Sequence, residues 1–73
     1  MKASYRINKN SISIRVPKEM VLNFINYLAI GLESPYTQIG LKSYPNYVIF
    51  YCKDIFHSEL KIMVSELNKG WSF

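Results

Sequence analysis

The spacing of the apolar residues constrains this chain most, because it changes along the sequence between the period of a strand and the period of a helix. Residues 4–8 and 11–16 alternate polar with apolar side chains, which is typical of strands that bury one face. Residues 18–32 and 54–69 instead repeat apolar side chains three and four positions apart, as amphipathic helices do. The first half of the chain therefore predicts a hairpin followed by a helix.

The second half repeats this order. Residues 37–42 alternate weakly, a turn follows at 43–46, and residues 47–52 are rich in β-branched and aromatic side chains, which favour strands. The predicted order is ββαββα. It fits an α+β domain with one four-stranded antiparallel sheet and two helices packed on one face. We expect residues 1–73 to form a single domain.

Capping signals set the predicted helix limits. Pro17 suits the first position of a helix and Gly31 its end, while Asp54 suits an N-cap and Gly70 the end of the last helix. The predicted core faces of the two helices are Val21, Phe24, Ile25, Leu28 and Leu32, and Phe56, Leu60, Met63, Val64 and Leu67.

Composition decides whether so short a chain can fold. Its 73 residues are 49% hydrophobic, which is too apolar for a disordered segment. The single Cys52 allows neither an internal disulfide nor a cysteine zinc site, which fits a reducing compartment. No signal peptide or membrane span is recognisable, so we expect a cytoplasmic protein.

Strand alternation assigns side chains to two faces of the sheet. The predicted helix-facing set is Tyr5, Ile7, Ile12, Ile14, Val16, Ile39, Leu41, Val48, Phe50 and Cys52. The predicted open set is Ser4, Arg6, Asn8, Ser13, Arg15, Gln38, Lys42, Tyr47, Ile49, Tyr51 and Lys53.

The open set combines cations with phenol rings, and the net charge of +4 favours a polyanionic partner. Single-stranded nucleic acid is commonly held by cations that contact phosphates and aromatic rings that stack on bases. The sequence thus predicts contact with RNA or single-stranded nucleic acid. The predicted phosphate contacts are Arg6, Arg15, Lys42 and Lys53, and the predicted stacking residues are Tyr47 and Tyr51.

A protein partner is the alternative. Tyrosine and arginine often anchor protein interfaces, so the chain could occlude a host or defence protein, contact a nucleic-acid-associated protein or bind a second copy of itself. The interface candidates are Tyr36, Tyr44, Trp71 and Phe73. A palette rich in Lys, Asn, Ile and Tyr is similar in style to small accessory proteins of phages and other mobile elements.

Residues 11–19, SISIRVPKE, resemble the strand and first-helix entry of ribbon-helix-helix repressors. The resemblance implies that exposed strand residues read the DNA major groove. It covers only the first part of such a domain, because Pro35 and the predicted strand at 47–52 stand where the second helix of that family would follow. Sequence-specific DNA binding is therefore a minor alternative.

No constellation of residues predicts catalysis or a cofactor. Cys52 is expected to point into the core, away from His57, and Asp54 and Glu59 are five positions apart and point in different directions on a helix. Gly31, Gly40 and Gly70 are isolated and form no phosphate-binding loop. We expect a non-enzymatic binding module without a cofactor.

Overall fold

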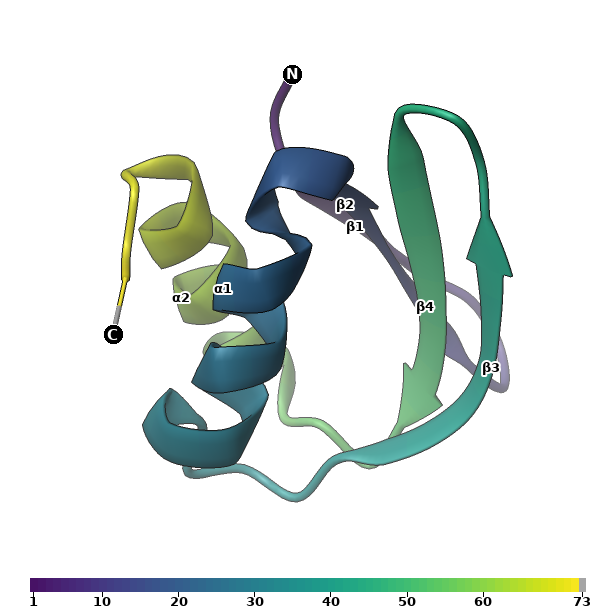
Figure 1. Ribbon diagram of the computed structural model, residues 1–73. Helices are drawn as coiled ribbons and strands as arrows, with labels where there is room; N and C mark the ends of the chain where they lie inside the picture. Colours follow the sequence, from purple (N-terminus) through teal and green to yellow (C-terminus); the bar gives the residue numbers. More distant parts are fainter. Residues whose placement is uncertain (73) are drawn as a thin grey trace.

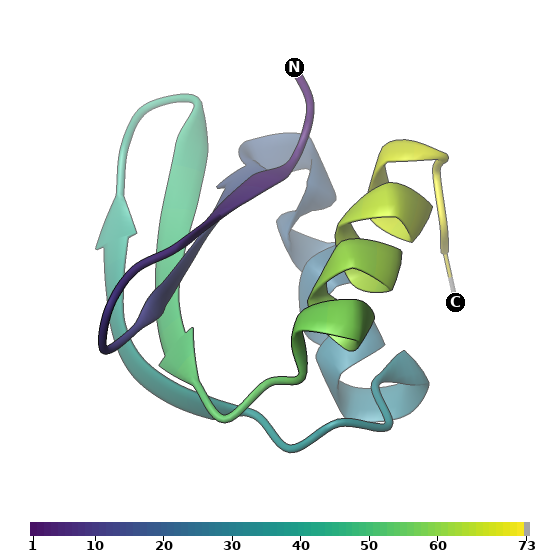
Figure 2. The same cartoon turned by 180° about the vertical axis from the view of Figure 1, so that it is seen from behind.

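The computed structural model describes residues 1–72 and has an α+β architecture of one four-stranded antiparallel sheet and two helices, which confirms the predicted class. The strands are β1 (Ser4–Ile7), β2 (Ile12–Pro17), β3 (Thr37–Ser43) and β4 (Tyr47–Lys53), and the helices are α1 (Val21–Asn26) and α2 (His57–Asn68). Both helices lie on the same side of the sheet in two opposite views (Figure 1, Figure 2).

The strands are arranged in the order β1-β2-β4-β3, and each neighbouring pair is antiparallel. β2 and β4 occupy the centre, although the chain leaves the sheet between them to form the first helix. Burial alternates with the pleat along β4 and along β2 up to Val16, because one face of each strand packs under the helices, and Pro17 at the end of β2 is buried as well. β1 and β3 are edge strands, and most of their residues are exposed.

The core lies between the sheet and the helices. Phe24 of α1 packs on Phe50 of β4 with the ring centroids 4.5 Å apart. The buried apolar residues of this core are Ala3, Ile12, Ile14, Val16, Phe24, Tyr27, Val48, Phe50, Cys52, Ile55, Leu60, Met63, Val64 and Leu67. The predicted burial of Cys52 is thus confirmed.

The first helical segment is less regular than its sequence period suggests. A 3₁₀ turn, η1 (Lys18–Met20), precedes α1, and a π-helical turn, η2 (Tyr27–Gly31), follows it. The 3₁₀ and π turns on either side of α1 interrupt the regular 3.6-residue period on which the predicted core face rests. Tyr27 is buried and Ile25 is 49% exposed, so the prediction that Ile25 lies in the core is wrong. Pro17 ends β2 instead of opening the helix.

The start of α2 also differs from its prediction. Phe56 is the N-cap residue and is 57% exposed, so it is neither a helical nor a core residue. Its backbone N–H donates to the Ser34 hydroxyl at 2.8 Å. Asp54 adopts φ +72° two residues earlier, and its carboxylate accepts a hydrogen bond from the Thr37 hydroxyl at 2.7 Å. The predicted Asp54 cap is therefore a turn residue that ties β4 to β3.

The end of α2 turns the chain back onto the molecule. Gly70 has φ +87°, a conformation that suits glycine, and the Trp71 N–H donates to the Glu66 carbonyl at 3.0 Å. This geometry directs Trp71 onto Tyr27, where the ring centroids are 4.9 Å apart. Asn68 also bonds to both backbone polar groups of Ala3, at 2.7 and 2.9 Å, which joins the last helix to the start of β1.

A bulge in β3 corrects the predicted faces of that strand. Gln38 pairs with Cys52 and Gly40 pairs with Tyr51, so Ile39 is an extra residue in the register. Gln38 therefore lies in the helix-side row, contrary to its predicted open position. Ile39 and Leu41 were predicted to face the helices, but they are 50% and 54% exposed because the helices do not cover this edge of the sheet.

Candidate nucleic-acid interface

Charge is divided between the two layers of the molecule. The strands and their hairpin turns, residues 4–17 and 37–53, contain five lysines or arginines and no aspartate or glutamate. The rest of the chain has four such cations and five carboxylates. The sheet layer therefore contributes +5 and the remainder −1 to the net charge of +4. The sheet layer is therefore the positively charged part of the molecule.

Two rows of cross-strand neighbours build the open face. In the first row Arg6, Ser13, Tyr51 and Gly40 stand side by side across the four strands. In the second row the order is Ser4, Arg15, Ile49 and Lys42. Each arginine of the β1–β2 pair thus faces a serine, which prevents repulsion between directly opposed like charges and leaves space above the serine.

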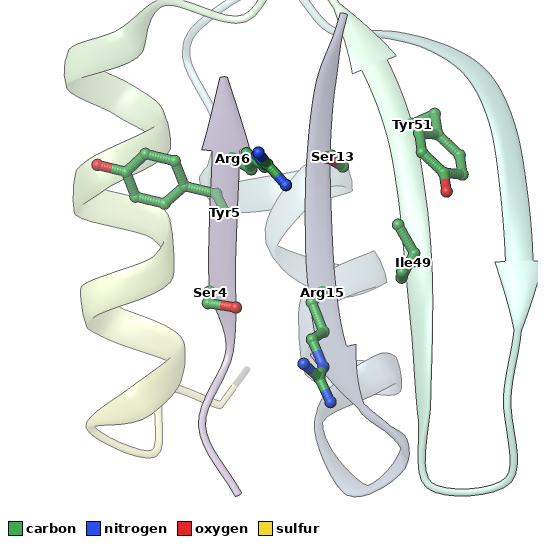
Figure 3. A pocket seen from close by; sticks show the side chains of 7 residues that line it. All are labelled: Ser4, Tyr5, Arg6, Ser13, Arg15, Ile49 and Tyr51. Atoms are coloured by element: carbon green, nitrogen blue, oxygen red, sulfur yellow. The ribbon is translucent and has the colours of Figure 1, made fainter. Parts of the chain in front are cut away.

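This space forms a hollow of about 350 Å³ over β1, β2 and β4. It is lined by Ser4, Tyr5, Arg6, Ser13, Arg15, Ile49 and Tyr51. In Figure 3, Arg6 extends from β1 towards β2, whereas Arg15 extends along β2 in the opposite direction from Ser13. Tyr5 points away from these side chains, beyond the edge of the sheet. The two guanidinium groups therefore lie at different ends of the hollow.

Arg15 is also part of a stack of four side chains, Arg15, Tyr47, Tyr44 and Lys42, which we call the ladder. Its guanidinium carbon lies 4.0 Å from the centroid of the Tyr47 ring. Tyr44, in the β3–β4 turn, stacks on Tyr47 at 4.7 Å with an angle of 22° between the rings. The Lys42 ammonium lies 5.5 Å from the Tyr44 centroid. A hydrogen bond with Tyr44 raises the pKa of Lys42, and the charge of Tyr44 raises it further. Two cations thus enclose two rings.

The ladder changes what Tyr47 can do. A guanidinium at 4.0 Å and a second ring at 4.7 Å cannot share one face of Tyr47, so they cover its opposite faces. A base can stack on Tyr47 only by displacing Arg15 or Tyr44. Contacts of this kind between a cation and a ring contribute about 0.5–1 kcal/mol at exposed sites. The ladder fixes the direction of Arg15 and leaves Tyr51 as the other aromatic residue of the open face.

The other predicted contact residues lie outside the hollow. Lys53 pairs with Thr37 at the end of the sheet and lines a second, smaller hollow of about 220 Å³ with Lys9 and His57. Tyr36 packs against the core, where burial and then the neighbouring Cys52 raise the pKa of its phenol. Trp71 packs on Tyr27, and Phe73 lies outside the described residues.

Three lining residues, Ser4, Ser13 and Ile49, were placed on the open face by alternation but not selected as contacts. The signal that identifies them is the register: Ser13 opposite Arg6 and Ser4 opposite Arg15. Tyr44 was selected only as a protein contact, yet it stacks on Tyr47. Because Tyr44 lies in a turn, alternation along the strands gave no information about its direction.

Residues 1–72 contain no cluster of three or more His, Cys, Asp or Glu side chains suited to a metal ion. Within the same residues, no helix has the length and apolar character needed to cross a membrane. Burial raises the pKa of the Cys52 thiol above its ordinary value.

Comparison with known proteins returned no match: no family model fits the chain, and neither a curated protein nor a solved structure is significantly similar to it.

Proposed function

We propose that this protein is a non-enzymatic binding module of ββαββα order that holds RNA or another single-stranded nucleic acid on the sheet face that its helices leave uncovered. The observation that carries the proposal is the separation of charge: the sheet layer has five cations and no carboxylate. Attraction between such a layer and phosphates is the main source of affinity for nucleic acids.

The side chains on this face supply the second component of single-strand binding. Tyr51 offers a ring beside the hollow, and Arg6 and Arg15 form no ion pair with a carboxylate within residues 1–72. Their guanidinium donors are therefore available to phosphate oxygens, which they match in geometry. Base stacking and phosphate contact can occur together on one surface.

The test is the affinity for a short single-stranded RNA, measured by fluorescence anisotropy at about 50 and 200 mM salt. Each phosphate contact on a single strand contributes about −0.7 to the slope of log affinity against log salt concentration. We expect the double variant Arg6→Ala/Arg15→Ala to bind more weakly and to lose about 1.4 from the slope.

The matched control removes the same charge from the other layer. Lys61 and Lys69 are exposed residues of α2 and its C-terminal cap. Lys61→Ala/Lys69→Ala should retain most of the affinity. Equal losses in the two double variants would show that net charge alone attracts RNA and would contradict the assignment of the sheet face.

A protein partner is the second candidate, and a different surface favours it. Large apolar side chains are exposed away from the open face, on the edge strand β3 and on the outer side of the first helical segment. They are Leu22, Ile25, Ile30, Ile39 and Leu41. Exposed apolar groups of this kind occur at protein interfaces. RNA binding that is absent at both salt concentrations would favour this candidate.

A further inference from the structure

The open face contains a hollow whose shape and chemistry suggest a more specific ligand than a polyanion. Its volume of about 350 Å³ falls at the small end of the range for pockets that hold small molecules, roughly 300–1,000 Å³. Its lining combines an aromatic ring, an aliphatic side chain, two arginines and serine hydroxyls. We propose that this hollow is a subsite for one nucleotide with a phosphate on each side, an inference that rests on the proposed function.

The surface on which a nucleobase would pack is formed by side chains of β4. Ile49 and Tyr51 are successive outward residues of this central strand and lie on the same side of the sheet in Figure 3. The Tyr51 ring is supported by Gly40 of β3, where an added Cβ would lie 3.6 Å from the Tyr51 Cδ2 atom. A nucleobase can therefore pack against Tyr51 and Ile49 without displacing another ring, which Tyr47 does not permit.

The two phosphate positions come from β1 and β2. Arg6 pairs with Ser13 and Arg15 pairs with Ser4, so the two arginines are diagonal neighbours on one face. Such positions are about 7–8 Å apart at the backbone. Arg6 and Arg15 extend to opposite ends of the hollow (Figure 3), and a nucleotide within a chain has phosphates on its two sides. One arginine can contact each phosphate.

Arg15 is prepared for this contact by the ladder. The Arg15 guanidinium carbon lies 4.0 Å from the centroid of the Tyr47 ring, and the N–H donors of a guanidinium point outward in its own plane. Those donors can bond to a phosphate while the guanidinium remains in contact with the ring. A side chain that is already ordered loses less conformational entropy when it binds.

The experiment compares three ligands of one series by NMR titration of the intact chain: adenosine, adenosine 5′-monophosphate and adenosine 3′,5′-bisphosphate. We expect affinity to rise by roughly tenfold with each added phosphate, because each gains charge-assisted hydrogen bonds. The Nε–H signals of Arg6 and Arg15 and the amide signal of Ser13 should move with the bisphosphate.

Variants assign the contributions. Arg6→Ala and Arg15→Ala should each remove one of the two tenfold steps, whereas Tyr51→Leu should weaken all three ligands by a similar factor and keep both steps. Lys61→Ala, on the other layer, should change none of these affinities. Arg15→Lys keeps the charge but loses the planar guanidinium that contacts Tyr47, so it should recover only part of the step that Arg15→Ala removes.

The outcomes separate the two proposals. If the three ligands bind equally or not at all while short RNA still binds to the open face, the nucleotide subsite is wrong and the proposed function stands. If short RNA does not bind either, the proposed function fails and the subsite fails with it. Thermal denaturation of each variant checks that its fold is retained.

Discussion

The two faces of the sheet are made by the same strands, yet they have different chemistry. On the helix side, Ile14 and Phe50 stand beside each other, and both are buried beneath the helices. One residue along each strand, Ser13 and Tyr51 stand beside each other on the open side and line the hollow. The alternation places a core residue and an open-face residue one position apart on the same strand, so substitutions on the open face should change the stability of the fold less than substitutions on the helix side.

The largest expected effect is on the helix side. Phe24→Ala removes a fully buried ring that packs on Phe50, and such truncations cost about 3–5 kcal/mol of the free energy of unfolding. For a domain of this size that loss is comparable with its whole stability. Urea denaturation followed by circular dichroism should show a largely unfolded variant. A loss below 1 kcal/mol would mean that this core is not packed as described.

On the open side, Tyr51→Ala should weaken RNA binding by about 1–3 kcal/mol, which is the range for loss of one stacked base. The ring is only partly buried, and it packs over Gly40 of the edge strand, so the free energy of unfolding should change much less than in Phe24→Ala. Anisotropy and urea denaturation of the same preparation test both statements. A variant that melts but binds normally when folded would reverse the roles of the two faces.

A smaller effect is expected where the helix layer meets the edge of the sheet. Asn68→Ala removes two hydrogen bonds to the backbone of Ala3, each worth about 0.5–1.5 kcal/mol. Amide hydrogen exchange should become faster at Ala3 and in β1, while exchange in β4 should change little. Equal acceleration in both strands would show that β1 does not open separately from the rest of the sheet.

The smallest effect concerns pH. Burial raises the pKa of Cys52, so the folded chain favours the neutral thiol more than the unfolded chain does. This contribution is fully present below the pKa of the thiol in the unfolded chain, about 8.5, and is lost as pH rises through the raised value in the folded chain. Stability should fall above about pH 8.5, and Cys52→Ala should reduce this fall. Tyr36→Phe should also reduce this fall, since burial raises the pKa of the Tyr36 phenol as well.

The central strands were the most predictable part of the fold. Ile12, Ile14 and Val16 alternate with Ser13 and Arg15, and burial follows that alternation because neighbours on both sides hold the register. The edge strand β3 was not predictable in the same way. It has one neighbour and no helix above its outer residues, so a bulge at Ile39 costs little and changes the face of Gln38.

The candidate site, too, was predictable only in part. Alternation placed Arg6, Arg15 and Tyr51 on the open face, and the structure brings these three around one hollow. It did not reveal that Arg15 and Tyr44 cover both faces of Tyr47. That contact joins β2 to the β3–β4 turn, and its formation depends on the order in which the strands pair.

The sequence by itself determined the number and type of the main elements, the apolar side of β2 and β4, and the cationic character of the strands, because these depend on local periodicity and residue type. Only the tertiary structure decided the strand order, the bulge at Ile39, the inward turn at Tyr27 and the pairing of each arginine with a serine. These features arise from contacts between segments far apart in the chain, whose energies no local pattern records.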